Sequence, residues 1–502
     1  MTLLIRNVQI LGSERKLPDR FDVFVNGDKI AAIGRFPGKS ADEIIEGQEM
    51  FLAPGFIDVD TESDHYLSVF SNPSQEDFIK QGVTSIIGGM CGASLAPLLY
   101  GSLEALEEWT RIAEVNVDWH TMDEFSKVLE KIPRGVNFAT LVGHTTIRQA
   151  IIGRKPRDLT KNELKVFVEI LNRALEEGGW GLSTGLGYAQ SRDVPYAEIS
   201  ALATIVKKVD GVYATHLRSE TIALKEAVDE TLRLVREVGV KTLISHFMPT
   251  YGYEDAYKNV LDRIHNLPNA DDVQYSVYPF STRILKLYTF LPAWAQKENL
   301  DVMNMSLQDE WLRSKILKEL PAVDPKHFVV AQAPGNEALV GYTLFDLKKM
   351  FSLKSFGEAL MKLMLTTKLQ AIIFYENVNF DLVREALKSR HSLVASNAAS
   401  FKLNPRRKIL KPERATSTFT KFLSMVQNDN LMSIDEAIKK ITFEPARKFN
   451  LINRGLIKEG YFADLVVFKG DQVNFVVVNG RLAVKNGEFT GVLNGRFLRF
   501  KA

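Results

Sequence analysis

The sequence predicts an α/β protein, a (β/α)8 TIM-type barrel with a small β-sandwich domain formed by both chain ends. Three observations support this fold class. Short apolar runs alternate with amphipathic helical stretches through the middle of the chain, both ends are rich in short strands and Asn-Gly turns, and 502 residues are enough for a barrel plus a smaller satellite domain.

Eight short apolar runs predict the parallel strands of the barrel. The stretches between them are amphipathic: Ala223, Ala227, Leu232 and Val235 recur on one face of a predicted helix, and Gly239 favours its C-terminal cap. The predicted strands are 55–58, 84–89, 137–144, 180–184, 212–216, 241–246, 272–278 and 392–397.

The same pattern predicts the domain boundaries. Residues 1–53 and 456–502 are expected to pair in the small β-domain, and residues 54–455 are expected to form the barrel. Residues 285–370, between the seventh and eighth strands, are too many for an ordinary connection. We therefore predict an inserted subdomain or lid there.

Charge and composition argue against several classes of partner. The 63 Lys and Arg residues nearly balance the 61 Asp and Glu residues, so neither nucleic acid nor an anionic membrane is expected to bind. The one basic run, 405–408, is interpreted as a solvated loop. No apolar run approaches the roughly 20 residues that cross a bilayer, and the N-terminus has the pattern of a strand and not of a signal peptide. A cytoplasmic protein is expected, and its oligomeric state is not indicated.

Polar side chains follow several predicted strands, at the barrel end where the reactive groups of this fold gather. Cys91, the only cysteine, follows the second strand, and His216 and His246 end the fifth and sixth strands. Two imidazoles and a thiolate are a ligand set suited to Zn²⁺. Each residue alone would be interpreted as a buried core residue, but their shared position favours a metal site. The other candidates at this end are Asp60, Glu62 and Asn397.

Motifs along nearly the whole chain outside the insert point to one family. They are APGFID, QGVTSIIGGMCGASLAPL, LVGHTTIR, GLSTGLGY, GVYATHLRSE, LISHF, VYPF, LPAW, RATSTF, RGLIKEGYFADLVVF and VVVNGRL. Together they resemble the N-acyl-D-amino-acid deacylase (D-aminoacylase) family of the amidohydrolase superfamily. The resemblance implies a hydrolase that cleaves the amide bond of a small N-acyl substrate, with zinc held by Cys91, His216 and His246.

The chain departs from the family pattern at the first and eighth strands. Asp60 and Glu62 stand where the family has a His-x-His pair; they could bind a second, harder metal ion or hydrogen-bond to donors at the rim. Asn397 replaces the family's aspartate, which moves a proton between water and the departing amine, and an amide cannot accept that proton. Asp60, Glu62 or Asp64 could serve as the base from the opposite side.

The substrate-binding positions are also altered. Family members carry a basic residue two positions after the second metal histidine, where this chain has Met248. Tyr188 and Tyr278 match positions that line the family's substrate pocket, although packing at the barrel mouth is the alternative. Arg218 and Glu220 could orient substrate or pair with one another.

Two further histidines lie near the predicted rim. His144 is expected to support the rim structurally, whereas His65, three residues after Glu62, could restore a lost metal ligand.

Two functions from different classes remain. The first is a metal-dependent amidohydrolase with a remodelled site that holds one zinc ion. The second is a catalytically silent barrel that serves as a ligand-binding or scaffold protein. Because the substitutions spare Cys91, His216 and His246, the pattern favours the first.

Overall fold

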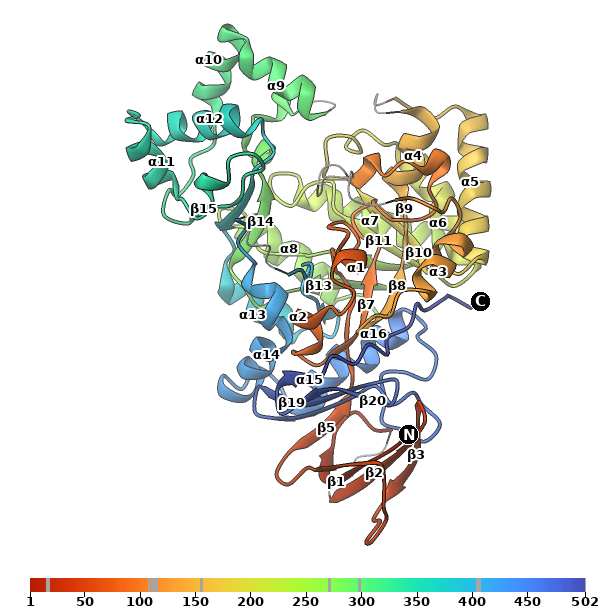
Figure 1. Ribbon diagram of the computed structural model, residues 1–502. Helices are drawn as coiled ribbons and strands as arrows, with labels where there is room; N and C mark the ends of the chain where they lie inside the picture. The colour runs from red at the N-terminus through yellow and green to blue at the C-terminus, as the bar shows by residue number, and fades with distance from the viewer. Residues whose placement is uncertain are drawn as a thin grey trace.

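The computed structural model describes residues 1–14, 19–106, 109, 116–153, 157–269, 272–296, 299–402 and 408–501. A β-rich region that holds the N-terminus lies at the bottom of Figure 1, parallel strands and helices lie in the middle, and the segment around α9–α12 projects at the upper left. Of the basic run 405–408, only Lys408 falls within the described residues, so the solvated-loop prediction lies outside them.

The central region is α/β, with parallel strands in the order of a β/α barrel. Its two sheets have the orders β6-β7-β8 and β9-β10-β11-β12-β13-β17. The strands are β6 (Phe56–Asp58), β7 (Val83–Gly88), β8 (Asn137–Thr140), β9 (Val142–Gly143), β10 (Gly181–Gly185), β11 (Val212–His216), β12 (Lys241–Ile244), β13 (Val273–Val277) and β17 (Ser392–Val394).

Each predicted strand run overlaps an observed strand, with one interruption. The third run is split at Leu141 into β8 and β9, each of which pairs with a different neighbour. The first and last strands meet just beyond their ends, where the Asn397 amide donates to the Asp60 carbonyl at 2.8 Å and the Glu62 amide donates to the Ala398 carbonyl at 2.9 Å. These bonds place the segments after β6 and β17 side by side.

Helices follow the strands as the apolar periodicity predicts. Helix α5 begins at a capping box formed by Thr160 and Glu163, and α7 ends at Gly239 in the left-handed conformation. The helices outside the insert are α1 (Ser68–Ser71), α2 (Glu76–Ile79), α3 (Met122–Glu130), α4 (His144–Ile152), α5 (Lys161–Glu176), α6 (Tyr196–Lys208), α7 (Leu224–Val238), α8 (Glu254–His265), α13 (Phe380–Lys388), α14 (Glu413–Asn428), α15 (Ile434–Ile441) and α16 (Phe443–Lys448).

The two chain ends meet in the small β-domain, but not as two separate sheets. The nine strands found among its described residues form one hydrogen-bonded sheet in the order β21-β20-β19-β18-β5-β1-β2-β3, with β4 paired to β1. Leu3, Val25, Leu465 and Val477 pack in its apolar core. Where a sandwich was predicted, pairing of β5 with β18 joins the two ends edge to edge. The strands are β1 (Thr2–Ile10), β2 (Arg20–Asn26), β3 (Lys29–Gly34), β4 (Glu43–Glu46), β5 (Phe51–Pro54), β18 (Leu465–Lys469), β19 (Gln472–Val478), β20 (Arg481–Lys485) and β21 (Glu488–Phe489).

The last residues of the chain leave this sheet and lie against the barrel, which differs from the predicted boundary. The Phe138 amide donates to the Arg496 carbonyl at 2.8 Å, and the Leu498 amide donates to the Phe138 carbonyl at 2.8 Å. The Phe497 ring packs against the rings of Phe125 and Phe138. The apolar side chains of this tail are therefore buried against the barrel and do not extend the sheet.

The insert is a separate unit with its own apolar core, which includes Phe328, Leu344 and Leu360. It runs from Thr282 to Glu376, slightly beyond the predicted 285–370, because these two residues pair where its first and last strands meet. Its elements are the antiparallel strands β14 (Thr282–Lys286), β16 (Ile372–Glu376) and β15 (Phe328–Gln332), and helices α9 (Leu300–Gln308), α10 (Glu310–Glu319), α11 (Leu344–Met350) and α12 (Phe356–Thr367).

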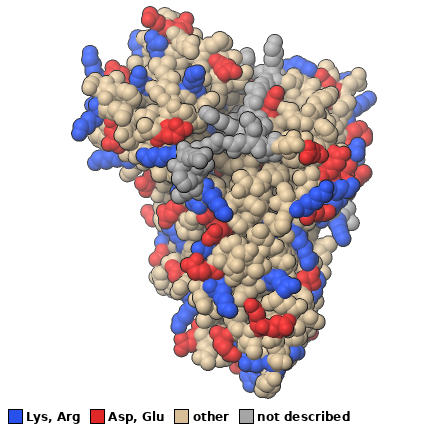
Figure 2. Space-filling view, viewed as in Figure 1, with Lys and Arg blue, Asp and Glu red and all other residues tan. Residues whose placement is uncertain are grey.

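The surface carries charges of both signs. Lys and Arg side chains are interspersed with Asp and Glu on the face drawn in Figure 2. Within the described ranges, no helix combines the length and the apolar character needed to cross a bilayer.

Candidate metal centre

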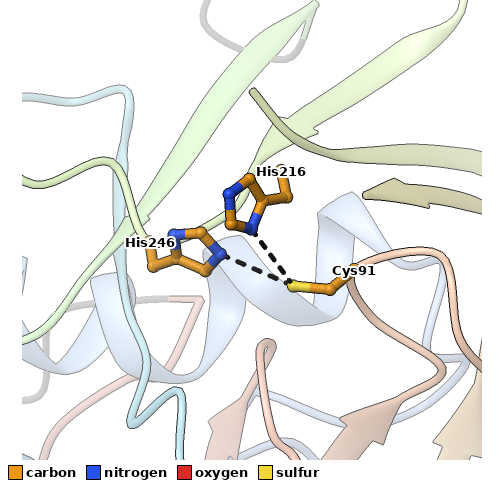
Figure 3. Close-up of side chains that lie close together, drawn as sticks. All are labelled: Cys91, His216 and His246. Atoms are coloured by element: carbon orange, nitrogen blue, oxygen red, sulfur yellow. Dashed lines mark hydrogen bonds between the residues drawn. The ribbon is translucent and has the colours of Figure 1, made fainter. Parts of the chain in front are cut away.

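Cys91, His216 and His246 converge (Figure 3): His216 is the last residue of β11, and Cys91 and His246 follow the ends of β7 and β12. The Cys91 Sγ lies 3.9 Å from His216 Nδ1 and 3.5 Å from His246 Nε2, and the three ligand atoms all lie within 4.8 Å of one another. Tetrahedral zinc bonds of about 2.0–2.3 Å separate neighbouring donor atoms by roughly 3.5 Å. The cluster therefore fits a zinc ion in both chemistry and spacing.

The backbone at this rim adopts an uncommon conformation. Cys91 has φ +52°, His246 has φ +36° and Asn397 has φ +44°, all in the left-handed region that non-glycine residues rarely occupy. Neighbouring strands hold these turns: the His246 amide donates to Ser276 Oγ at 2.6 Å, and the Gly92 amide donates to Ser183 Oγ at 3.0 Å. Such strain persists where surrounding contacts enforce it, and it is common at functional sites.

Burial controls the protonation of the cluster. It lowers the pKa of His216 to about 3, so that imidazole is neutral near pH 7, and it raises the pKa of the Cys91 thiol. Burial opposes protonation of His246 as well, but hydrogen bonds to Cys91 and Glu220 outweigh it and raise the pKa of His246. A divalent cation would take the place of the proton between Sγ and Nε2 and hold Cys91 as a thiolate.

Asp60 and Asn397 lie together beside the cluster. Ser276 Oγ donates to Asp60 Oδ2 at 2.8 Å, and Asn397 Nδ2 lies 3.4 Å from Asp60 Oδ1. Among the described residues, the only group of three or more potential metal ligands is Cys91, His216 and His246. Asp60 and Glu62 do not belong to this group. For Asp60, the hydrogen bond from Ser276 supports the prediction that it bonds to a donor at the rim.

The other two predicted acids differ in their surroundings. Glu62 lines the cavity described below, and burial raises its pKa against the opposing charge of Arg414. Asp64 faces the protein interior, where its Oδ2 accepts a hydrogen bond from the Gly89 amide at 2.6 Å. Its other oxygen is buried and has no hydrogen-bond partner among the residues that the structure describes.

His65 does not restore a metal ligand. Its Nε2 lies 3.2 Å from the Ala93 carbonyl, and its ring packs on Trp109 at 4.6 Å. His144 is fully buried and pairs with Glu198, in keeping with a supporting role.

A cavity of about 1310 Å³ opens beside the cluster, between the barrel rim and the insert. Tyr188 lines it with its ring centroid 4.7 Å from that of His216, and Arg218 also lines it. Met248 and Tyr278 are buried and are not among its lining residues, and the Arg414 guanidinium lies 4.5 Å from the Tyr278 ring.

Of the two alternatives for Arg218 and Glu220, pairing with one another is wrong. Arg218 instead donates two hydrogen bonds to Glu230 on α7, at 3.0 and 2.8 Å. Glu220 accepts from His246 Nδ1 at 3.0 Å and from Arg283 Nη1 at 2.7 Å, and these positive partners hold its pKa below the ordinary value despite burial.

Three residues at the site were missed from the sequence. Ser276 points inward from β13, and its alternation with Tyr275 and Val277 was the available signal. Arg283 and Lys286 both lie on β14, which the predicted insert boundary cut in two. The Lys286 Nζ lies 3.7 Å from the centroid of the Trp109 ring and 4.8 Å from that of Tyr188.

An α/β barrel with a Cys-His-His group at its strand ends is an arrangement suited to a metal-dependent hydrolase. The model of the amidohydrolase family matches residues 375–490. The D-aminoacylase of Alcaligenes xylosoxydans xylosoxydans is 27% identical over 508 residues, which cover 95% of this chain and 93% of that protein.

Solved structures of related proteins match this chain over nearly its full length. A D-aminoacylase, described with one-metal activation and second-metal attenuation of its binuclear centre, is 25% identical with a TM-score of 0.80 and 99% coverage of both chains. The N-acyl-D-glutamate deacylase of Bordetella bronchiseptica, solved with zinc and a phosphonate inhibitor, shares the fold at 24% identity, a TM-score of 0.81 and 99% coverage of both chains. Over nearly its whole length the chain is therefore similar to D-aminoacylases, in sequence and in fold.

Proposed function

We propose that this protein is a metal-dependent amidohydrolase that cleaves the amide bond of N-acyl-D-amino acids or related N-acyl compounds, with one zinc ion held by Cys91, His216 and His246. The observation that carries the proposal is the convergence of these three ligands beside a large cavity. The names of the relatives, D-aminoacylase and N-acyl-D-glutamate deacylase, supply the substrate class.

A single ion is favoured over two. Asp60 is held by Ser276 and lies beside Asn397, and Glu62 belongs to no second ligand group among the described residues. A related D-aminoacylase is activated by one metal and attenuated by the second, which is consistent with a one-metal enzyme. A second ion, if bound here, would be a harder one that accepts carboxylate oxygens.

Glu62 is the best-placed residue to move the proton that Asn397 cannot. Zinc supplies polarisation of the acyl carbonyl and activation of water. A nearby base must still accept the proton of the attacking water and deliver it to the departing amine. Of the three acids, Glu62 alone lines the cavity, and burial raises its pKa toward the range where a carboxylate can both accept and donate a proton.

Positive charge for a substrate carboxylate comes from β14. Met248 carries no charge, but its backbone carbonyl accepts a hydrogen bond from Arg283 Nη2 at 2.9 Å, which brings a guanidinium to that position. Arg283 and Lys286 both line the cavity. Because Arg283 is already paired with Glu220, we assign recognition of the substrate's anionic group to Lys286, with Tyr188 as an adjoining wall.

A second function, a silent barrel that binds a ligand or serves as a scaffold, is favoured by one observation. Asn397 occupies the position of the family's proton-transfer residue, and its amide is turned to Asp60. Without a replacement base the rate would fall by about 10²–10⁴-fold.

A substrate screen with zinc-loaded protein separates the two functions. N-acyl-D- and N-acyl-L-amino acids with small and large acyl groups are offered, and release of the free amino acid is measured. Turnover of D-enantiomers that is lost in Cys91→Ala supports the enzyme. Zinc-loaded, folded protein without turnover of any compound supports the silent barrel.

A further inference from the structure

We infer that Glu220 and Arg283 are positioning residues that hold His246 as a metal ligand and connect the insert to the metal centre. The inference rests on the proposed metal-dependent function, because it concerns the ligand geometry of that same site. Neither residue is a predicted ligand, and Arg283 reaches the site from a separate subdomain.

The first step is the orientation of the His246 ring. A carboxylate only accepts hydrogen bonds, so the 3.0 Å contact with Glu220 Oε1 requires His246 Nδ1 to carry the hydrogen. Nε2 then presents its lone pair toward Cys91 Sγ, 3.5 Å away. Carboxylate partners of this kind fix the tautomer and the orientation of metal-binding histidines.

The second step is the support of Glu220. Arg283 Nη1 donates to Glu220 Oε2 at 2.7 Å, and Nη2 donates to the Met248 carbonyl at 2.9 Å. One guanidinium therefore holds both the carboxylate that orients the His246 ring and the backbone two residues beyond His246. This double hold acts on a residue whose φ of +36° needs support from its surroundings.

The third step is the origin of Arg283. It lies on β14, the first strand of the insert, which pairs with β16 along its whole length. Arg283 is only 8% exposed, so its fork is buried between the two units. A displacement of β14 would therefore pull on Glu220 and, through it, on His246.

The chain contains a matched control. Glu198 is also buried and also bonds one histidine and one arginine, His144 Nε2 at 2.8 Å and Arg148 Nε at 3.0 Å. His144 is not part of the metal cluster. Replacing Glu198 thus removes the same type of contact without touching a metal ligand.

The test is the zinc dissociation constant, measured by competition with a chromophoric chelator, with circular dichroism to confirm the fold. Glu220→Gln should weaken zinc binding by about 10–100-fold, whereas Glu198→Gln should stay within about threefold of the parent. Parent-like affinity in Glu220→Gln, or an equal loss in Glu198→Gln, overturns the inference. If the parent protein binds no zinc, both the proposed function and this inference fail. If the parent binds zinc and Glu220→Gln binds it equally well, only the inference about Glu220 and Arg283 fails.

Arg283 is tested by a double-mutant cycle in the same assay. Arg283→Met should weaken zinc binding by about tenfold in the parent and by less than about twofold in Glu220→Gln. In Glu220→Gln the carboxylate through which Arg283 acts on His246 is already absent. Equal losses in both backgrounds would show that Arg283 acts independently of Glu220. If Glu220→Gln does not fold, Arg283→Met alone still tests the inference, because it should weaken zinc binding by about tenfold.

Discussion

At the residue scale, Asn397 is the substitution with the greatest chemical consequence. Its side-chain amide donates to Asp60 Oδ1 at 3.4 Å, and unlike a carboxylate it cannot take up a proton there.

Restoring the acid tests whether the barrel geometry is inherited. Asn397→Asp should raise amidase activity, and the gain should grow as the pH rises, because two neighbouring carboxylates compete for one proton. Steady-state rates between pH 6 and 9 measure this, with Asn397→Ala as the control that adds no base. Absence of any gain, with zinc bound and the fold retained, would show that the substrate pocket itself has changed.

The three acids after the first strand make distinct predictions. Glu62→Gln should lower kcat by about 10²–10⁴-fold, the usual cost of losing a general base. Asp64→Asn should leave kcat nearly unchanged, because Asp64 bonds the Gly89 amide away from the cavity. Asp60→Asn should lower kcat by an amount between those of the other two variants. Unchanged rates in all three variants would eliminate a base on this strand.

The sequence located part of this site and missed the rest for a physical reason. Cys91, His216 and His246 follow three barrel strands, and strand ends of a barrel meet at one rim, so their convergence could be predicted. Arg283 could not be found in this way, since its contact with Glu220 spans 63 residues and depends on how the insert docks.

At the element scale, Asp58 links the first barrel strand to the last. Both of its carboxylate oxygens lie 3.1 Å from the backbone amide of Ser396, and Oδ1 also accepts from the Asp60 amide at 3.2 Å. Burial nonetheless raises the pKa of Asp58 to about 7.

This buried acid predicts a pH dependence of stability. The folded state binds the Asp58 proton more tightly than the unfolded chain does, so stability should fall between about pH 4 and pH 7, by on the order of 4 kcal/mol. Asp58→Asn cannot titrate, and the gap in unfolding free energy between it and the parent should shift in its favour as the pH rises. Urea denaturation of metal-free protein checks this. Two parallel stability curves would contradict it.

The barrel strands could be predicted from the sequence because buried β-rich runs are short and bounded by polar residues. The interruption at Leu141 and the course of the C-terminal tail were not, because both depend on tertiary partners. Phe497 lies on Phe138, a residue more than 350 positions away. No local pattern distinguishes such a tail from another strand of the β-domain.

At the scale of the whole molecule, the insert and the barrel share the site. The barrel supplies the three proposed metal ligands, and the insert supplies Arg283, Lys286 and one side of the cavity.

The zinc content of the purified protein tests the central claim most directly. Elemental analysis should find about one equivalent of zinc in the parent protein, and none in folded Cys91→Ala or His246→Ala, because three ligands are needed to hold the ion. Native protein that carries no zinc and takes up none on addition, with its fold intact, would contradict the account.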